Sequence, residues 1–249
     1  MQRRYIDRIS LNEDVPAESY LSKLSVVRAL SESEPLTLTS NISFFVGENG
    51  SGKSTLMEAI AVAYGFNAEG GTKNFNFATQ STHSDLYKYL RISRSKYAKD
   101  GFFFRAESFY NVASNIEELD GELMSSPPII YSYGGVSLHA QSHGESLLAL
   151  VQNRFGGNGL YILDEPEAAL SPARMMTLMA EIYRLENNNS QFIIATHSPI
   201  LMTYPNAQIY QFTEDGVTPV GYKDTEHYQI TRRFLENPER MLKFLLEEN

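Results

Sequence analysis

Apolar residues in this chain gather in short runs that alternate with segments of helical spacing, above all from residue 42 onwards. Runs dense in aromatic and β-branched residues predict buried strands at 42–46, 101–106, 160–163 and 191–196. Apolar positions at helical spacing predict helices at 54–64, 145–155 and 172–185. Strands that alternate with helices favour a mostly parallel sheet covered by helices on both faces, so the predicted fold class is α/β.

The remaining segments predict smaller elements around this core. Residues 1–40 alternate polar and apolar side chains in places, which predicts two or three strands, antiparallel in part. Residues 65–80 are rich in Gly and Asn and predict an irregular loop, and residues 115–124 predict a helical turn. We expect a helical or inserted lobe at about 66–145 within a single domain of residues 1–249.

Three more short predictions complete the chain. Residues 84–98 predict a short helix followed by a strand. The segments 209–212 and 217–220 predict a hairpin, because Glu214-Asp215-Gly216 between them is a turn sequence. Two helices are expected after it, at about 225–235 and 238–247.

Composition and charge narrow the class of protein. The chain has no cysteine, which excludes disulfides and thiolate metal sites and favours a cytoplasmic location. It contains no apolar run of about 18 residues and no secretory leader pattern, so we expect no direct membrane insertion. A formal net charge of −9 argues against a protein whose whole surface binds nucleic acid, although a local basic patch is compatible with it.

The first candidate site directly follows the predicted strand 42–46. Gly47 is followed by four residues and then by Gly52-Lys53-Ser54, the spacing of a phosphate-binding loop between a strand and a helix. Glycines let backbone N–H groups converge on phosphate oxygens, and Lys53 adds a positive charge near the β- and γ-phosphates. The predicted ATP-binding residues are Gly47, Glu48, Asn49, Gly50, Ser51, Gly52, Lys53, Ser54 and Thr55.

The second candidate site lies at the end of the strand 160–163, where Asp164 and Glu165 follow four apolar residues. Open α/β sheets bind ligands at the carboxyl ends of their strands, so these carboxylates are expected beside the phosphate loop. Asp164 and the Ser54 hydroxyl are the predicted Mg²⁺ ligands, and Glu165 is placed to take a proton from an attacking water. The alternative is an acidic helix start, because Asp and Glu favour first turns.

Further landmarks in the second half of the chain lead to a resemblance. They are, in order, Ser142-His143-Gly144-Glu145-Ser146, Leu163-Asp164-Glu165-Pro166, Ala169-Leu170-Ser171-Pro172 and Thr196-His197-Ser198-Pro199. After a phosphate loop, this order resembles an ABC-type ATPase, and the chain looks like a small standalone bacterial "predicted ATPase" of the AAA/ABC-like group, related to SMC and RecF. The resemblance implies a P-loop NTPase with an ABC-ATPase head: a mostly parallel core sheet, an N-terminal antiparallel β part and a small helical lobe.

The resemblance also implies roles for individual residues. Ser142, Gly144 and Glu145 correspond to the signature motif, which caps the γ-phosphate of ATP held by the opposite subunit. The alternative for Ser142 is a helix N-cap without a ligand. Ala169, Leu170 and Ser171 correspond to the D-loop, which links two sites across a dimer. His197 corresponds to the switch histidine, so that Glu165, His197 and Lys53 are the expected catalytic residues.

Two family positions have more than one candidate. The Q-loop residue follows a strand between the phosphate loop and the signature; Glu107 follows the strand 101–106, and Gln80 is the substitute within an irregular loop. For the aromatic residue that stacks on adenine, Tyr5 and Tyr20 are candidates.

These patterns predict an ATP-binding and ATP-hydrolysing switch that forms an ATP-sandwich homodimer with ATP and Mg²⁺ as cofactors. Its output is expected on nucleic acid or on a partner protein; the alternative is the nucleotide-binding subunit of an ABC transporter with a membrane partner. A nucleic-acid output would use a predicted basic cluster, for which a solvated charged face is the alternative. Its members are Arg91, Arg94, Lys96, Lys99 and Arg105.

Overall fold

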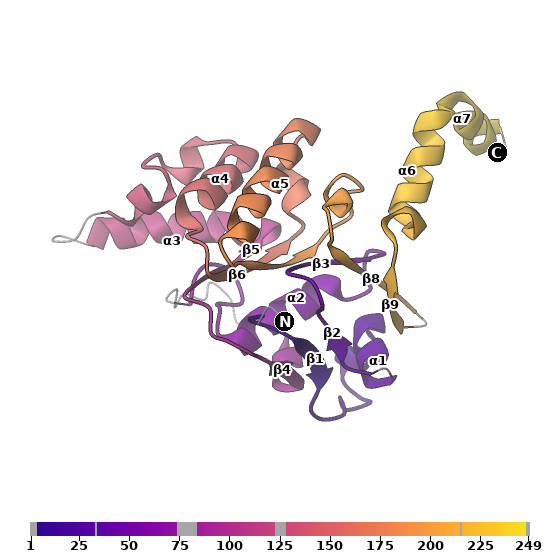
Figure 1. Ribbon diagram of the computed structural model, residues 1–249, viewed down its shortest axis with the longest axis horizontal. Coiled ribbons are helices and arrows are strands. Elements are labelled where there is room, and N and C mark those ends of the chain that lie inside the picture. The colour runs from indigo at the N-terminus through magenta and orange to yellow at the C-terminus, as the bar shows by residue number, and fades with distance from the viewer. Residues whose placement is uncertain (1–3, 33, 74–83, 123–127, 215, 248–249) are drawn as a thin grey trace.

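A six-stranded sheet forms the centre of the molecule (Figure 1). The computed structural model describes residues 4–32, 34–73, 84–122, 128–214 and 216–247. The strand order is β5-β6-β7-β3-β8-β9, and all neighbours are parallel except the β8–β9 hairpin. The strands are β3 (Ile42–Gly47), β5 (Asp100–Arg105), β6 (Gly159–Asp164), β7 (Gln191–Ala195), β8 (Gln208–Thr213) and β9 (Gly216–Val220). The predicted parallel sheet is thus confirmed.

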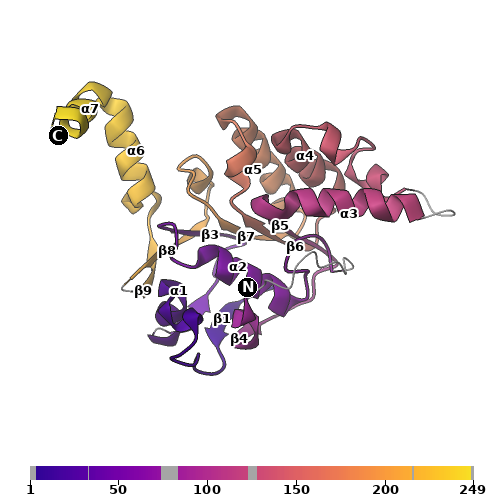
Figure 2. The ribbon, with the colours of Figure 1, turned by 180° about the vertical axis from the view of Figure 1, so that it is seen from behind.

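The central strands are apolar because both of their faces are covered. Every residue of β3, β6 and β7 is buried. Side chains alternate along a strand, so Phe44 belongs to the apolar core on one face and Phe45 to the core on the other. The helices α3 (Phe109–Glu122), α4 (His143–Ala149) and α5 (Pro172–Asn187) cover the Phe44 face, and α2 (Lys53–Tyr64) covers the Phe45 face (Figures 1 and 2).

A small antiparallel sheet lies on the α2 side of the molecule. It consists of β1 (Arg8–Leu11), β2 (Leu36–Thr37) and β4 (Leu90–Ser93), in the order β2-β1-β4. The predicted N-terminal antiparallel part is confirmed, but its third strand comes from beyond the phosphate loop. Residues 20–32 are helical, including α1 (Ser25–Glu32). Of the two or three strands predicted in residues 1–40, two are therefore present, and Val26, Val27 and Leu30 lie in a helix, where they bury one face.

The described residues between α2 and α4 contain more regular secondary structure than their sequence indicates. The predicted helical turn at 115–124 is part of α3, which begins six residues earlier at Phe109. The buried stripe Phe109, Val112, Ala113 and Ile116 has the spacing of a helix packed on one face. Strands β4 and β5 lie within the range 66–145, so the long helices of that range begin only after residue 108. Part of the expected loop at 65–80 lies outside the described residues.

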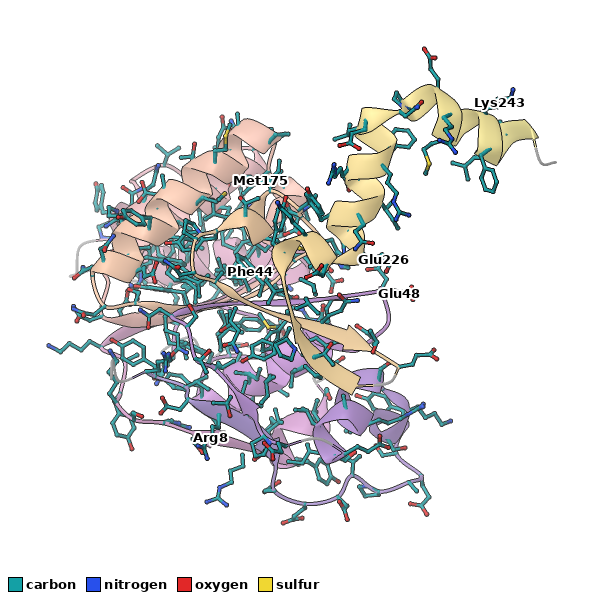
Figure 3. All side chains as sticks on the ribbon, turned by 45° about the vertical axis from the view of Figure 1, so that its right-hand side comes forward. Arg8, Phe44, Glu48, Met175, Glu226 and Lys243 are labelled. Carbon is teal, nitrogen blue, oxygen red and sulfur yellow. The ribbon has the colours of Figure 1, made fainter. Side chains whose placement is uncertain are left out.

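Two helices at the C-terminal end extend away from the body as an arm (Figures 1 and 3). They are α6 (Glu226–Glu236) and α7 (Pro238–Glu247), close to their predicted positions. From Gln229 to Arg240 every side chain is exposed, which includes the apolar side chains of Ile230 and Leu235. Among the described residues, every helix is too short or too polar to span a membrane.

Candidate active site

The phosphate loop joins β3 to α2 at the carboxyl edge of the central sheet. Its glycines have positive φ angles, 149° at Gly47, 81° at Gly50 and 91° at Gly52. A side chain at Gly47 would overlap the carbonyl oxygen of Phe212 on β8, and a Cβ at Gly52 would lie 2.7 Å from Val26 Cγ1. The loop therefore requires glycine both for its backbone conformation and for its close approach to neighbouring elements.

Lys53 is the first residue of α2, and only 5% of it is exposed. Its Nζ donates to the carbonyl oxygens of Gly47 and Glu48, both at 2.7 Å, and lies 3.3 Å from Ser51 Oγ. Burial lowers the pKa of Lys53, and nearby carboxylates, first among them Glu165, oppose that shift. The ammonium group is held at the centre of the loop, beside the backbone N–H groups that begin α2.

Asp164 ends β6 and faces the start of α2. Ser54 Oγ donates to Asp164 Oδ1 at 3.2 Å. Burial raises the pKa of the Asp164 carboxyl to about 7, while the guanidinium of Arg105 opposes the shift. Arg105 Nε lies 3.9 Å from Asp164 Oδ2. The two predicted Mg²⁺ ligands are therefore neighbours at the carboxyl edge of the sheet.

Arg105 and Glu58 belong to this site, although sequence reasoning did not place them there. Arg105 ends β5 in register with Asp164 on β6, and its Nη1 donates to Glu58 Oε2 on α2 at 2.6 Å. Glu58 is buried and also accepts the backbone N–H of Ser84 at 2.7 Å. The available signal was the position of Arg105 at the end of an apolar strand, the same position that identified Asp164.

Arg105 lies at the opposite end of β5 from Lys99, so the five residues of the predicted basic cluster do not all form one patch. Lys99 precedes the first residue of β5 and Arg105 is its last, so about 20 Å of extended chain separates them. Arg94 donates to the carbonyl oxygen of Ala63 at 2.9 Å, and Lys96 Nζ lies 4.2 Å from the centre of the Tyr5 ring. The inclusion of Arg105 was wrong, because β5 carries it to the opposite edge of the sheet, where it pairs with Glu58. The grouping of the other four residues stays a prediction.

Glu165 and His197 face each other beyond the ends of β6 and β7. Glu165 has left-handed backbone angles, φ 51° and ψ 52°, which are uncommon outside glycine and occur at functional sites. Its Oε1 lies 3.6 Å from His197 Nε2. The backbone N–H of His197 donates to Glu167 Oε1 at 2.5 Å, and burial together with the charge of Lys53 lowers the pKa of His197. The imidazole is therefore neutral at pH 7.

The predicted signature residues lie on α4, at a different place in the fold. Ser142 caps the helix in a capping box, and its N–H donates to Glu145 Oε2 at 3.0 Å. Arg174 of α5 donates to Ser142 Oγ at 3.1 Å and to Glu145 Oε1 at 2.9 Å. Gly144 is buried, and a Cβ there would lie 2.5 Å from the carbonyl oxygen of Ala169. Ser142 and Glu145 are exposed at the surface, as a role at an interface requires. Ser142 is also the N-cap of α4, which is the alternative interpretation of this residue.

The predicted D-loop connects β6 to α5 and contacts the signature helix. Ala169 ends a short 3₁₀ turn, Pro166–Ala169, and Leu170 packs in the apolar core with 8% exposed. Ser171 Oγ accepts the N–H of Arg174 at 3.4 Å as the N-cap of α5. The segment therefore joins the end of β6 to α5 and packs against α4, the helix that carries the exposed Ser142 and Glu145.

The candidates for the Q-loop residue and for the adenine-stacking aromatic residue occupy different places in the structure. Glu107 follows β5 in a short turn with 83% of its side chain exposed, 3.5 Å from Arg105 Nη2, and Gln80 lies outside the described residues. Tyr5 is buried, and its Oη donates to the carbonyl oxygen of Asn189 at 2.9 Å, just before β7 begins. That is the amino edge of the sheet, so Tyr5 does not reach the phosphate loop, whereas Tyr20 is exposed and stays a prediction.

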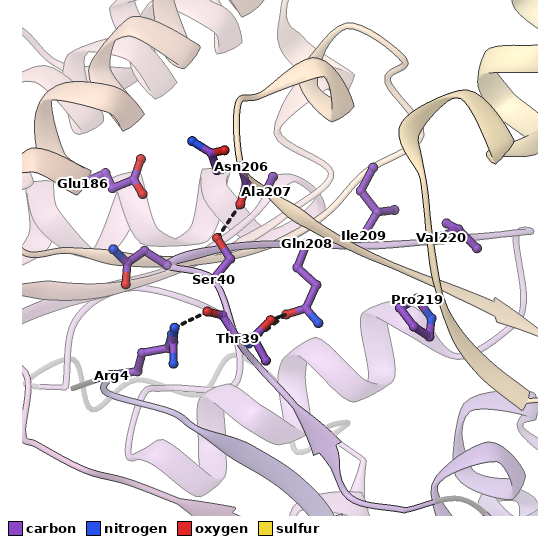
Figure 4. Close-up of a pocket in the computed structure, with 11 residues that line it drawn as sticks. Arg4, Thr39, Ser40, Glu186, Asn206, Ala207, Gln208, Ile209, Pro219 and Val220 are labelled. Atoms are coloured by element: carbon purple, nitrogen blue, oxygen red, sulfur yellow. Dashed lines mark hydrogen bonds between the residues drawn. The ribbon is translucent and has the colours of Figure 1, made fainter. Parts of the chain in front are cut away.

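A polar pocket of about 510 Å³ also lies at the amino edge of the sheet (Figure 4). Its polar side chains bond to one another and to the backbone: Gln208 Oε1 accepts from the N–H and the hydroxyl of Thr39, at 2.8 and 2.9 Å. Ser40 Oγ donates to the carbonyl oxygen of Asn206 at 2.8 Å. The pocket is at the opposite edge from the phosphate loop, and its geometry ties β3 to β8 rather than forming part of the candidate site.

The residues at the carboxyl edge fit a triphosphate and Mg²⁺. The positive-φ glycines leave a backbone cradle without side chains beside Lys53. Within the described part of the chain, the buried atoms Arg105 Nε and His197 Nε2 have no hydrogen-bond partner, so polar groups at the site are open to a ligand. Ser54 and Asp164 supply two oxygen donors, and Mg²⁺ typically takes few protein oxygens together with phosphate oxygens and water.

The sheet order and the loop geometry at this edge give the chain the fold of a P-loop NTPase of the ABC-ATPase-head type. Among solved structures, the ATP-binding cassette MJ1267 of an ABC transporter matches with a TM-score of 0.55 and 15% identity, over 93% of this chain and 98% of that one. Its ADP conformation matches with a TM-score of 0.50 and 17% identity, over 97% and 99%. The SMC head domain from Thermotoga maritima matches with a TM-score of 0.42 and 15% identity, over 87% and 99%.

Family models match two separate parts of the chain. The family "AAA domain" matches residues 23–121, which include the phosphate loop. The family "AAA domain, putative AbiEii toxin, Type IV TA system" matches residues 136–203, which include the signature, Asp164 and His197. No curated protein matches the chain significantly. Each family model covers less than half of the chain, and both describe AAA domains; together with the fold, they support a resemblance to ATPases of the AAA/ABC-like type.

Proposed function

We propose that the chain is an ATP-driven switch, in which two copies enclose two ATP molecules between the phosphate loop of one and the signature of the other. One observation carries the proposal. Ser54, Asp164, Glu165 and His197 converge on the phosphate loop, whereas Ser142 and Glu145 are exposed on α4, a separate part of the surface. One chain therefore supplies the two halves of a site on different surfaces, and a second copy would bring them together.

In this proposal each residue at the sheet edge has a defined task. The backbone N–H groups of the phosphate loop and the Lys53 ammonium hold the β- and γ-phosphates. Ser54 and Asp164 would hold Mg²⁺, which when bound supplies positive charge to the phosphate oxygens. Glu165, at the rim of the site, orients a water for in-line attack and accepts its proton, and His197 holds an N–H toward the reacting phosphoryl group.

The proposed cycle follows from what both copies contact. The γ-phosphate is the group that the phosphate loop of one copy and the signature of the other hold together. Its hydrolysis and release remove that shared contact, so the dimer loosens. We propose an output on a partner protein or on nucleic acid, and a transporter subunit is the alternative. Similarity to a transporter cassette at this level of identity shows the fold alone. Of the predicted basic residues, Arg105 lies at the candidate site and not with Lys99 at the other end of β5.

The first test uses Glu165→Gln, which removes the proposed proton acceptor and keeps the size of the side chain. We expect this variant to bind ATP with Mg²⁺ and to accumulate as a dimer in size-exclusion chromatography with light scattering, because the γ-phosphate persists. Glu118→Gln, on the exposed surface of α3, is the matched control and should behave as the wild type. A variant that stays monomeric at saturating ATP would contradict the sandwich dimer.

A mixing experiment tests whether sites are shared between copies. Ser142→Asp retains a good N-cap for α4 but places a negative charge where the partner's triphosphate would lie, and Ser142→Asn is its uncharged control. Lys53→Ala and Ser142→Asp should each lose ATPase activity alone. An equimolar mixture should recover about a quarter of the wild-type rate, because half of the dimers are mixed and each has one intact site. No recovery, with mixed dimers demonstrated, would show that each site lies within one chain.

A further inference from the structure

The first turn of the C-terminal arm brings His227 into hydrogen-bond distance of the candidate site. Thr225 caps α6, and it is fully buried; its Oγ1 donates to the carbonyl oxygen of Tyr222 at 2.8 Å, which anchors the first turn. From this turn, His227 Nε2 lies 2.9 Å from His197 Nδ1, with ring centres 4.9 Å apart. The two imidazoles are thus joined by a hydrogen bond between separate parts of the fold.

The surroundings decide which ring donates this hydrogen bond. Burial lowers the pKa of both histidines, so both rings are neutral and each has one N–H. His197 Nε2 faces Glu165 Oε1 at 3.6 Å. A lone pair on Nε2 would point at a carboxylate, whereas an N–H there is attracted to it. His197 therefore has its proton on Nε2, so its Nδ1 accepts the hydrogen bond and His227 Nε2 donates it.

The base of α6 and the phosphate loop also share one hollow. A pocket of about 470 Å³ is lined by Glu48 and Asn49 of the loop, by both histidines, and by Ile230 and Thr231 of α6. Figure 3 shows Glu48 beside Glu226 at the start of α6. Movement of the arm would therefore change the surroundings of the phosphate loop and of His197, because residues of all three line the same pocket.

We propose that His227 is a positioning residue, which fixes the tautomer and orientation of His197 and so couples the C-terminal arm to ATP hydrolysis. The inference rests on the proposed function, because it assigns His197 a role at the γ-phosphate. A ring that accepts at Nδ1 presents its N–H to the reaction centre; without the donor, the ring is free to rotate or to adopt the other tautomer. His227 itself is not required to touch the nucleotide.

The main test compares three variants of His227 with a control on the same helix. His227→Phe keeps the ring size without an N–H, His227→Gln restores an N–H donor, and His227→Ala removes the side chain. We expect kcat to fall about tenfold or more in the Phe and Ala variants and to recover in part in the Gln variant, with little change in KM for ATP. Arg233→Ala, on the exposed part of α6, should keep the wild-type kcat.

A double variant separates positioning from a merely structural contact. If His227 acts only through His197, His197→Ala combined with His227→Ala should lose no more activity than His197→Ala alone. Additive losses would overturn the inference, as would a wild-type kcat in all three His227 variants. A wild-type protein that hydrolyses no ATP would instead contradict the proposed function.

The tautomer gives a readout that is independent of activity and of mutant folding. In the wild type, ¹⁵N spectra of the histidine side chains should show His197 with the proton on Nε2, and His227 also with the proton on Nε2. A proton on His197 Nδ1 would overturn the inference even if every His227 variant were unstable.

Discussion

Gly47 and Gly50 lie in the same loop but are constrained in different ways. Both have positive φ angles, 149° and 81°. A side chain at Gly47 would also overlap the backbone of Phe212, whereas a Cβ at Gly50 would meet no atom within 4 Å. The conformational cost of a side chain is therefore common to both positions, and the steric cost falls on Gly47 alone.

This difference predicts unequal effects of the same substitution. Gly47→Ala should lower the free energy of unfolding by about 3 kcal/mol or more and abolish ATP binding, because β3 and β8 must separate to admit the methyl group. Gly50→Ala should cost only about 1–2 kcal/mol, the cost of the left-handed conformation. Thermal and denaturant unfolding without nucleotide would measure both. Equal losses in the two variants would contradict the close packing of the loop against β8.

At the scale of residues, the sequence indicated candidate site residues only where they are close neighbours in the chain. The loop from Gly47 to Ser54 and the pair Asp164-Glu165 each carry their own spacing signal. Arg105 and His227 are brought to the site by strand order and by the path of the chain after β9. Neither is fixed by local spacing, because a single sequence states which residues end strands but not which strands are neighbours.

At the scale of elements, one carboxylate fastens the end of the signature helix to the sheet. Asp100, the first residue of β5, accepts from Arg154 Nη1 at 2.8 Å, from the N–H of Gly156 at 2.8 Å and from Tyr161 Oη at 2.7 Å. Arg154 ends the helical turn that continues α4. Although burial raises the pKa of Asp100, these hydrogen bonds and the charge of Arg154 outweigh it, so the pKa is lowered.

A carboxyl whose pKa is lowered by folding stabilises the protein where it is ionised and loses this effect in acid. Asp100→Asn should therefore lower the free energy of unfolding by about 2 kcal/mol at pH 7. The difference from the wild type should be complete above about pH 5 and should shrink as the pH falls through the folded-state pKa. Denaturant unfolding of both proteins at a series of pH values would measure it.

The matched control is a carboxylate of the same type at the surface. Asp85 pairs with Lys88 at 2.8 Å, but their side chains are 61% and 55% exposed. Asp85→Asn should therefore change the free energy of unfolding by less than about 0.5 kcal/mol at any pH. A pH-independent difference for Asp100→Asn would contradict the assignment, because it would mean that the charge of Asp100 does not matter.

The sequence predicted strands and helices correctly where burial gives the apolar residues one clear periodicity, either that of a strand or that of a helix. The all-buried strands β3, β6 and β7 and the one-sided helix α5 fall where the periodicity placed them. The failures are α1 and the start of α3, where polar residues interrupt the apolar stripe. In α1, Val26 and Val27 are β-branched and locally favour a strand, and tertiary packing against β1, β8 and β9 overrides that preference.

At the scale of the whole molecule, stability is distributed unevenly. Two apolar cores lie on the two faces of the central sheet, so β3, β6 and β7 are covered from both sides. The arm has no comparable cover: Phe244 is 63% exposed and Leu246 is 71% exposed on α7. Isolated helices of this length are marginal in water, so the arm depends on its anchored first turn.

This distribution predicts a gradient of amide hydrogen exchange in the nucleotide-free chain. Amides of β3, β6 and β7 should exchange only through global unfolding, those around Thr225 and His227 at intermediate rates, and those of α7 within about tenfold of unstructured peptide. The helix α5 is the internal comparison, because it also has one exposed face but buries Met175, Leu178, Ile182 and Leu185. If α7 were protected as strongly as α5 in dilute monomer, the arm would have a packing partner within its own chain. The link through His227 would then not be its main attachment to the ATPase body.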